Sequence, residues 1–328
     1  MAAFDLFGDR PEKFLIIGRA GMDFYPDPPG TKTEDAERFV CCLGGSSSNI
    51  GVAICRHGGA AALVTCVADD SIGRYCLNQL AHYGIDARHV RSVGGEARNS
   101  LAVVESRVED HQSVIYRNGA ADFEMTVDDV SAVDFAAYGA LITTGTVFAA
   151  EPSRSASFHA FSLARAARLP LIFDLDYRPY SWPSAEVASE VYSRAGRACD
   201  IVIGNDDEFG FMAGGKDKGL DMARELAKTT ASIVIYKMGD RGSITVTRDD
   251  EFKTGIYPVD ALKPTGAGDA FMGGFIASLA NGYAIRDCVL RGSASAAMVV
   301  AKVGCAPAMP TTAELDQFLA DHPGPTDP

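Results

Sequence analysis

Two glycines and a carboxylate stand together at residues 265–269, where the sequence reads TGAGD, and a small-residue apolar stretch follows. Glycine lets a backbone approach a ligand closely because it has no Cβ. A helix that begins here directs unpaired N–H groups and the positive end of its dipole at the loop, which favours an anion. A phosphate repels a neighbouring carboxylate, unless that carboxylate takes a proton from the group attacking the phosphate. The segment therefore suggests phosphoryl transfer with Asp269 as the base, although alone it also fits a tight turn with a helix-capping Asp.

Two further polar segments have spacings that suit ligands. Residues 44–49 (GGSSSN) form a glycine-rich turn before a predicted helix, which suits either a polyhydroxy ligand or a serine-capped junction. Residues 205–208 (NDDE) follow a predicted buried strand, at the edge where open α/β sheets bind ligands. Asn205 and Glu208 stand one helical turn apart and suit a hydrated Mg²⁺. The acidic residues of this segment equally suit the first turn of any helix.

Two arginines stand at predicted loop positions. Arg178 lies in the segment 173–182, which begins at the end of a predicted strand, and Arg117 ends a predicted β-hairpin. A guanidinium group in a cleft binds a carboxylate or phosphate with two parallel hydrogen bonds. Each is also consistent with a surface arginine, and Arg178 has Asp174 and Asp176 nearby in sequence as carboxylate partners.

Strands alternate with helices along most of the chain, which predicts a mostly parallel sheet covered by helices on both faces. The expected strands are residues 14–18, 39–43, 61–67, 141–143, 171–174, 201–203 and 233–235. The expected helices are residues 50–58, 72–83, 152–168, 185–197, 269–281 and 285–303, the last two closing the chain. Hairpins are expected at 99–117 and 242–259, the first as a small sheet laid on the main one. The segment carrying Arg19, Gly21 and Asp23 is expected to be a loop.

Composition excludes several functional classes. The chain has 328 residues, 47 % hydrophobic and 22 % charged, with a net charge of −13, so nucleic acid and anionic membranes are unfavourable partners. It contains neither a P-loop nor a G-x-G-x-x-G motif after a strand, which argues against P-loop kinases and classical dinucleotide sites. No signal peptide and no run of about 20 apolar residues is found, so a cytoplasmic protein is expected. The eight cysteines lack C-x-x-C spacing and are expected to be buried reduced thiols without zinc.

Taken in order, these segments resemble the ribokinase (phosphofructokinase-B-type) family of sugar kinases. Residues 44–59 are similar to its first signature, residues 263–279 to its second, and residues 205–208 to its N-x-x-E motif. The resemblance covers residues 17 to about 310 and implies a ribokinase-like α/β fold in a single domain, 1–328. In that fold helices sandwich a mostly parallel central sheet, and a small β-sheet forms a lid, here from about 26–43 and 93–118. The tail, 322–328, is expected to be disordered.

The resemblance also implies a role for each candidate residue. Asp269 acts as the general base, and the anion hole is formed by Gly266, Ala267 and Gly268. The sugar hydroxyls are held by Asp23, Gly44, Gly45 and Asn49, and the substrate carboxylate is met by Arg117 and Arg178. ATP lies along Lys237, Gly239, Gly242 and Gly268, and Mg²⁺ with its waters is organised by Asn205 and Glu208.

The implied reaction is ATP-dependent phosphorylation of the terminal hydroxyl of a keto-deoxy sugar acid. Together, the matches at residues 17–20 with Asp23, 175–182, 200–204, 292–296 and 308–310 favour 5-dehydro-2-deoxy-D-gluconate. The alternative is 2-keto-3-deoxygluconate, whose kinases share a similar Tyr-Arg-Pro element. A kinase for a neutral sugar or nucleoside is disfavoured because its ligand would leave buried guanidinium groups unpaired. A non-catalytic sugar-acid sensor is disfavoured because the chain carries the base candidate Asp269, which a protein that only binds sugar acids does not need. The family also suggests a homodimer formed through the lid.

One position departs from the family pattern. Many members carry an Asp at the start of the second signature that helps to bind a potassium ion, whereas this chain has Lys263. An ammonium group there repels a cation. Lys263 is therefore expected either to replace the monovalent cation or to point to ATP, and it is included among the nucleotide-binding candidates.

Overall fold

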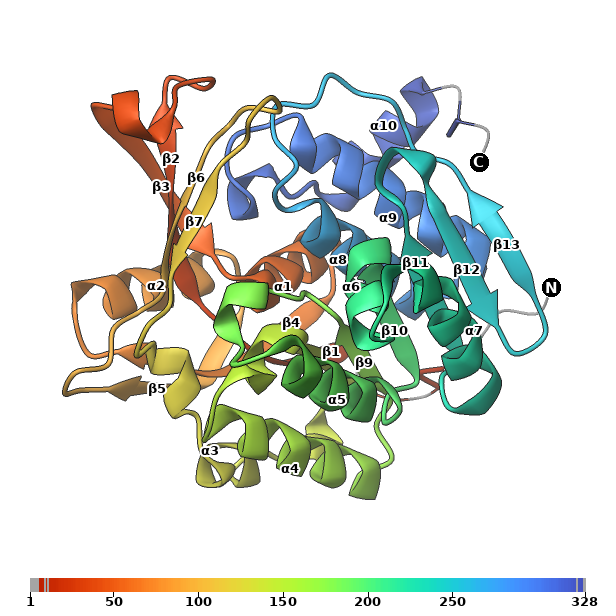
Figure 1. The fold of residues 1–328 in the computed structure, drawn as a ribbon, viewed down its shortest axis with the longest axis horizontal. Coiled ribbons are helices and arrows are strands. Elements are labelled where there is room, and N and C mark those ends of the chain that lie inside the picture. The colour runs from red at the N-terminus through yellow and green to blue at the C-terminus, as the bar shows by residue number, and fades with distance from the viewer. Residues whose placement is uncertain (1–5, 9, 11, 323, 327–328) are drawn as a thin grey trace. The chain divides into compact units, whose positions relative to one another are not determined.

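The computed structural model describes residues 6–8, 10, 12–322 and 324–326. The chain divides into two compact units. The first unit is built mainly from residues 18–124 and 257–324, and the second mainly from residues 5–17 and 125–256. Each unit is described by itself below, with the element labels of Figure 1.

The second unit contains most of a large, mostly parallel sheet. Its described strands lie side by side in the order β13 (Glu251–Thr254), β12 (Ser243–Thr247), β11 (Ile233–Lys237), β10 (Ile201–Asn205), β9 (Leu171–Asp174), β8 (Ala140–Thr144) and β1 (Lys13–Ile17). Strands β1 and β8 to β11 run parallel, and β12 and β13 add an antiparallel edge. The central strands read as continuous apolar runs because both faces of a parallel sheet are covered.

Helices follow the strands of the second unit in alternation. Helix α4 (Ser153–Ala166) packs on β8 and β9, α7 (Gly219–Thr229) packs on β11 and β12, and α6 (Asp206–Met212) begins directly after β10. The other described helices are α3 (Val127–Ser131), α5 (Ala185–Gly196) and the 3-10 turns η3 (Phe135–Ala137), η4 (Gly145–Ala149), η5 (Pro179–Ser181), η6 (Lys216–Lys218) and η7 (Gly239–Arg241). The alternating α/β prediction is confirmed here, and the predicted second hairpin ends at Thr254 rather than at residue 259.

The first unit contains a parallel strand pair, β4 (Ala60–Ala68) and β5 (Asp86–Val93), joined by helix α2 (Ser71–His82). The Asp70 carboxylate caps α2 by accepting hydrogen bonds from two N–H groups of its first turn. Strand β5 was not expected from the sequence. It reads DARHVRSV, and most of its side chains are partly or fully exposed, so it shows no apolar run.

A four-stranded sheet completes the β structure of the first unit. Its order is β3 (Arg38–Gly44), β2 (Gly21–Asp27), β6 (Leu101–Val104) and β7 (Ser113–Tyr116), coloured red-orange to yellow in Figure 1. Gly21 and Asp23 therefore lie in a strand, and the loop prediction for them was wrong. Pro26 is tolerated because it lies beyond the part of β2 that pairs with β6. The 99–117 hairpin and the small sheet are confirmed.

Helix α8 (Ala267–Ala280) is the central helix of the first unit. It is buried from Asp269 to Leu279 and packs against α1 (Ser46–Arg56) and α9 (Ile285–Val300). A methyl group at Gly273 would collide with the side chain of Ala53, so a larger residue would force α1 and α8 apart. A third closing helix, α10 (Thr312–Asp321), packs on α9 and was not predicted. The remaining turns are η1 (Thr33–Asp35), η2 (Ala121–Glu124) and η8 (Ala306–Ala308).

The predicted disordered tail is only partly described, because residues 323, 327 and 328 lie outside the described residues. Within it, the Thr326 N–H donates to the Ile256 carbonyl at 2.7 Å. That prediction and the single-domain prediction for 1–328 stay predictions. Across the described residues, every helix is too short or too polar to cross a bilayer.

Candidate active site

Both oxygens of the Asp269 carboxylate accept hydrogen bonds from side chains of helix α1. Its Oδ1 accepts a hydrogen bond from the Ser46 hydroxyl at 2.7 Å, and its Oδ2 accepts one from the Asn49 amide at 2.8 Å. Asp269 lies in the first turn of α8, and only 9 % of its surface is exposed. Sequence reasoning missed Ser46, although Ser46 stands inside the glycine-rich segment that had been singled out.

The start of α8 is shaped by Gly266. This residue is the N-cap and has φ 87°, in the left-handed region that favours glycine. A methyl group at Gly266 would also lie 2.6 Å from the sulfur of Cys305. Behind the cap, Ala267 and Gly268 begin the helix, where first-turn N–H groups have no intrahelical acceptor. These N–H groups and the positive end of the dipole favour an anion at this point.

Asp23 lies in β2 and is buried against β3. A methyl group at Gly44 would collide with its carboxylate, so the glycine permits this close approach. Its Oδ1 is buried and has no hydrogen-bond partner among the described residues. Burial raises the pKa of Asp23 to about 6, although Arg19, a weak hydrogen bond from Tyr25 and Lys263 act in the opposite direction.

The side-chain oxygen of Asn49 is a second buried acceptor without a partner in the described structure, after Oδ1 of Asp23. While its amide N–H group is bound to Asp269, its Oδ1 has no partner in the described part of the chain. Buried polar atoms in native proteins are nearly always hydrogen-bonded, so an exception calls for an explanation. Two orphaned oxygens, on Asp23 and Asn49, are both acceptors and suit a ligand that brings hydroxyl donors.

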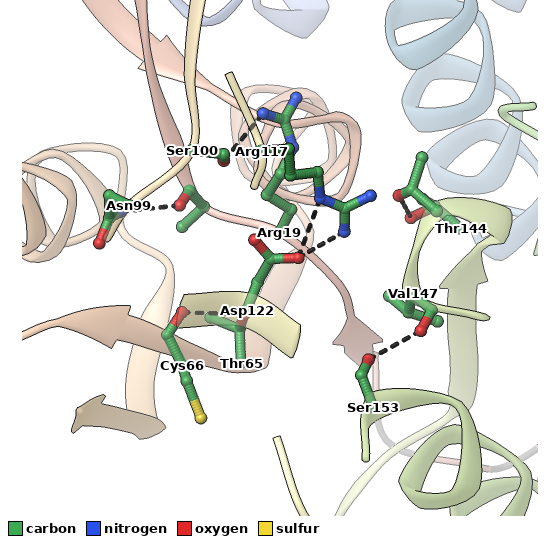
Figure 2. Close-up of polar contacts among 12 residues, drawn as sticks. Arg19, Thr65, Cys66, Asn99, Ser100, Arg117, Asp122, Thr144, Val147 and Ser153 are labelled. Atoms are coloured by element: carbon green, nitrogen blue, oxygen red, sulfur yellow. Dashed lines mark hydrogen bonds and ion pairs between the residues drawn. The ribbon is translucent and has the colours of Figure 1, made fainter. Parts of the chain in front are cut away.

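Arg117 is buried rather than being a surface arginine at a turn. Its Nε donates to Oδ2 of Asp122 at 3.2 Å, and its Nη2 forms an ion pair with the same oxygen (Figure 2). The guanidinium also lies over the ring of Phe123, 4.1 Å from the centroid. Asp122 is buried too, so the charge of Arg117 is already compensated within the protein.

In the second unit, Asn205 and Glu208 form a capping box at the start of α6. The Glu208 N–H donates to the Asn205 side-chain oxygen at 2.8 Å, and the Asn205 N–H donates to the Glu208 carboxylate at 2.7 Å. The other Glu208 oxygen accepts from the Tyr177 N–H at 3.2 Å. Burial raises the pKa of Glu208, and the positive charge of Lys237 opposes the shift.

The remaining candidates of the second unit lie in two loops. Arg178 forms an ion pair with Asp176 at 2.6 Å, and its side chain is 41 % exposed. Lys237 ends β11, and the turn η7 (Gly239–Arg241), which begins at Gly239 and is followed by Gly242, connects it to β12. Since Arg178 is paired with Asp176, its charge has a carboxylate partner, as the charge of Arg117 does.

Lys263 is completely buried in the first unit. Its ammonium group donates to two backbone carbonyls, that of Thr265 at 2.6 Å and that of Val299 at 3.3 Å. Burial lowers its pKa, although Cys305, Asp269 and other acidic groups nearby favour the charged form. The ammonium group therefore holds the residue immediately before Gly266, the cap of α8.

A cavity of about 600 Å³ also lies in the first unit, lined by residues 29–32, 35, 106–109 and 261–262. None of the candidate site residues lines it. It lies beside the loops of the small sheet, so it does not mark the chemistry suggested by Asp269.

The chain belongs to the pfkB family of carbohydrate kinases, whose model matches residues 11–312. It is 37 % identical to the 5-dehydro-2-deoxygluconokinase of Photobacterium profundum over 97 % of this chain and 98 % of the relative. Further relatives of that name are 33–34 % identical. The predicted resemblance to this family is confirmed, and the protein is a carbohydrate kinase.

Solved structures confirm the ribokinase-like fold. A fructokinase of Xylella fastidiosa with bound ATP matches with a TM-score of 0.83 and 22 % identity, over 94 % of this chain and 98 % of that one. A fructokinase variant of Vibrio cholerae, with fructose, ADP and potassium ion bound, matches with a TM-score of 0.82 and 24 % identity, over 95 % and 99 %. At these identities the likeness concerns the fold alone.

The pKa of Asp23 leads to a prediction about pH. Below about pH 6 the carboxyl is protonated and is a weaker hydrogen-bond acceptor, so kcat/KM should fall as the pH drops through about 6. The pH profile of kcat/KM for the sugar measures this limb. In Asp23→Asn the side chain has no titratable group, so the pH profile of the residual kcat/KM should lack the fall near pH 6. An unchanged limb in that variant would assign the titration to another group.

Proposed function

We propose that the protein transfers the γ-phosphoryl group of ATP to the terminal hydroxyl of a keto-deoxy sugar acid, and that 5-dehydro-2-deoxy-D-gluconate is converted to its 6-phosphate. The observation that carries the proposal is the Asp269 carboxylate, held by Ser46 and Asn49 at the N-terminus of α8. The names of the relatives support this choice of substrate.

In this proposal Asp269 takes the proton of the attacking sugar hydroxyl. At the same time the hydroxyl oxygen forms a bond to the γ-phosphorus, and the bond between that phosphorus and the ADP oxygen breaks. The hydrogen bonds from Ser46 and Asn49 fix the orientation of the carboxylate before the substrate arrives. The backbone of Gly266, Ala267 and Gly268 stabilises the charge of the phosphoryl oxygens, since N–H groups at a helix start attract anions. Positioning and charge stabilisation supply most of the catalysis in phosphoryl transfer.

The sugar hydroxyls are assigned to the two orphaned acceptors, Oδ1 of Asp23 and Oδ1 of Asn49. Gly44 and Gly45 have no Cβ, so the sugar can approach the backbone closely at the turn before α1. Arg117 and Arg178 are retained as residues near the carboxylate of the sugar acid, on the strength of the family resemblance.

The residues of the second unit are assigned to the nucleotide and its metal ion. Mg²⁺ keeps several waters and uses one or two carboxylates, and Glu208 lies within electrostatic reach of the Asp176 carboxylate, so this donor set fits a hydrated Mg²⁺. Asn205 and Glu208 would hold the ion and its waters, and the ion would neutralise phosphate charge. Lys237, Gly239 and Gly242 would lie along ATP.

Three alternatives compete with this substrate: 2-keto-3-deoxygluconate, a neutral sugar or nucleoside, and a sensor without catalysis. An assay of ADP release with 5-dehydro-2-deoxy-D-gluconate, 2-keto-3-deoxygluconate, fructose, ribose and adenosine separates them. The first acid should give the highest kcat/KM. A higher value for any other compound would reassign the substrate, and no release with any of them would favour the sensor.

Replacing the base tests its role directly. Asp269→Asn should keep the fold and ATP binding but lose on the order of 10³-fold or more in kcat, because an amide cannot accept the proton. Steady-state kinetics and ATP titration measure the two effects. The matched control is Asp249→Asn, at an exposed position, which should be as active as the wild type. Near-normal turnover of Asp269→Asn would refute the assignment.

The buried ammonium group of Lys263 predicts weak or absent activation by potassium. It donates to carbonyls at 2.6 Å and 3.3 Å and already supplies one positive charge to the loop before α8. Initial rates in sodium and potassium buffers of equal ionic strength should therefore agree closely. Several-fold higher rates in potassium would contradict this proposal.

We also propose a homodimer formed through the small sheet and a cytoplasmic location. Four large apolar side chains of this sheet are exposed: Phe39, Val40, Val114 and Tyr116. All eight cysteines are free thiols, as expected in a reducing compartment, although Cys41 is exposed and Cys55 only partly buried, so the prediction that all are buried was wrong for these two. Light scattering should give twice the mass of the chain, and Val40→Glu should shift it toward the monomer. A monomeric wild type would refute the dimer.

A further inference from the structure

Arg19 is a buried arginine to which no role has been given. It follows β1 by two residues, and only 9 % of its surface is exposed. Its Nη1 donates to the hydroxyl of Ser100 at 2.9 Å (Figure 2). Within the described part of the chain, no carboxylate lies at ion-pair distance from Arg19. Four of the five guanidinium donors therefore have no protein acceptor in these residues.

The backbone around Arg19 is held rigidly. Its carbonyl accepts a hydrogen bond from the Ser48 hydroxyl at 3.0 Å, and the carbonyl of Ala20 accepts one from the Asn99 amide at 3.0 Å. The Asn99 side-chain oxygen in turn accepts from the N–H of Ala68 at 2.6 Å. These bonds fix the backbone that carries the Arg19 side chain, and a side chain on a fixed backbone loses less entropy when it binds a ligand.

The other two candidate arginines differ from Arg19 in their charge balance. Arg117 is paired with Asp122, and Arg178 with Asp176. The charge of Arg19 lowers the pKa of Asp23, but within the described structure the two side chains are not at ion-pair distance. A largely buried charge without a hydrogen-bonded counter-ion is costly, so an anion that binds Arg19 would be stabilised there.

The location of Arg19 fits a sugar acid. Its partner Ser100 immediately precedes β6, and the strand register that pairs Leu101 with Tyr116 continues toward Ser100 and Arg117. Asp23, with its orphaned hydroxyl acceptor, lies four residues further along the chain from Arg19. A ligand that presents a carboxylate to the free guanidinium donors and hydroxyls to Asp23 would satisfy both.

We propose that Arg19 binds the carboxylate of the sugar acid and sets the preference of the enzyme for acids over neutral sugars. The inference rests on the proposed function, since it concerns the substrate of the same site. A planar guanidinium with free donors binds a carboxylate through two parallel hydrogen bonds. Arg117 is already paired with Asp122, so it offers the substrate carboxylate less uncompensated charge than Arg19 does.

The test compares 5-dehydro-2-deoxy-D-gluconate with its primary amide, which has nearly the same shape without the charge. In Arg19→Gln, kcat/KM for the acid should fall by on the order of 10²-fold or more, while kcat/KM for the amide changes little. Arg19→Lys should recover part of the loss because it restores the charge without the fork. The control is Arg74→Gln, at an exposed position, which should leave both values unchanged.

Three results would overturn the inference. Equal losses for acid and amide in Arg19→Gln would show that the residue only supports the fold or Asp23. An acid preference that persists in Arg19→Gln and disappears in Arg117→Gln would assign the carboxylate to Arg117. If Arg19→Gln does not fold, as judged by thermal unfolding, Arg19→Lys and Ser100→Ala carry the comparison. Both should reduce the acid preference several-fold, and an unreduced preference in both would overturn the inference.

The wild-type measurement separates this inference from the proposed function. A wild type that phosphorylates only neutral sugars would refute the proposed function and the carboxylate partner together. A wild type that prefers the acid, with the preference intact in Arg19→Gln, would refute only the role of Arg19.

Discussion

The packing of α8 between α1 and α9 determines the geometry of the first unit. The helix is buried over nearly its whole length, and Gly273 lets it approach α1 so closely that Ala53 leaves no space for a Cβ. This contact brings the first turns of the two helices together. Ser46 and Asn49 therefore reach the Asp269 carboxylate with hydrogen bonds of 2.7 and 2.8 Å. A shift of either helix would disturb the base and the anion-binding N–H groups at once.

Much of the fold could be predicted because the parallel strands are buried on both faces and read as apolar runs, as at residues 201–203 and 233–235. The start of α8 was predictable because its glycines and carboxylate are consecutive. Strand β5 was not, since its polar sequence carries no apolar run. Strand β2 was missed because glycine and proline suggest a loop, whereas pairing with β3 and β6 decides its structure.

The pairing of Arg178 with Asp176 was one of the alternatives given by the sequence, but the other charge partners could not be predicted, because burial and pairing depend on tertiary contacts. Arg117 and Asp122 are only five residues apart, but nothing in the sequence indicates that both are buried. Val299, whose carbonyl accepts from Lys263, is 36 residues away. For the same reason Arg19 was placed only in a predicted loop, although its lack of a carboxylate partner in the described structure distinguishes it from Arg117 and Arg178.

The cysteine beneath Gly266 has a consequence for the chemical durability of the protein. The sulfur of Cys305 fills the space under the cap of α8, and it lies 3.2 Å from the hydroxyl of Tyr25. Burial raises the pKa of Cys305 to about 12, so almost none of it is present as the reactive thiolate at neutral pH. The loop is therefore supported by a thiol that resists oxidation and alkylation, and the support lasts as long as the surrounding core keeps water and oxidants out.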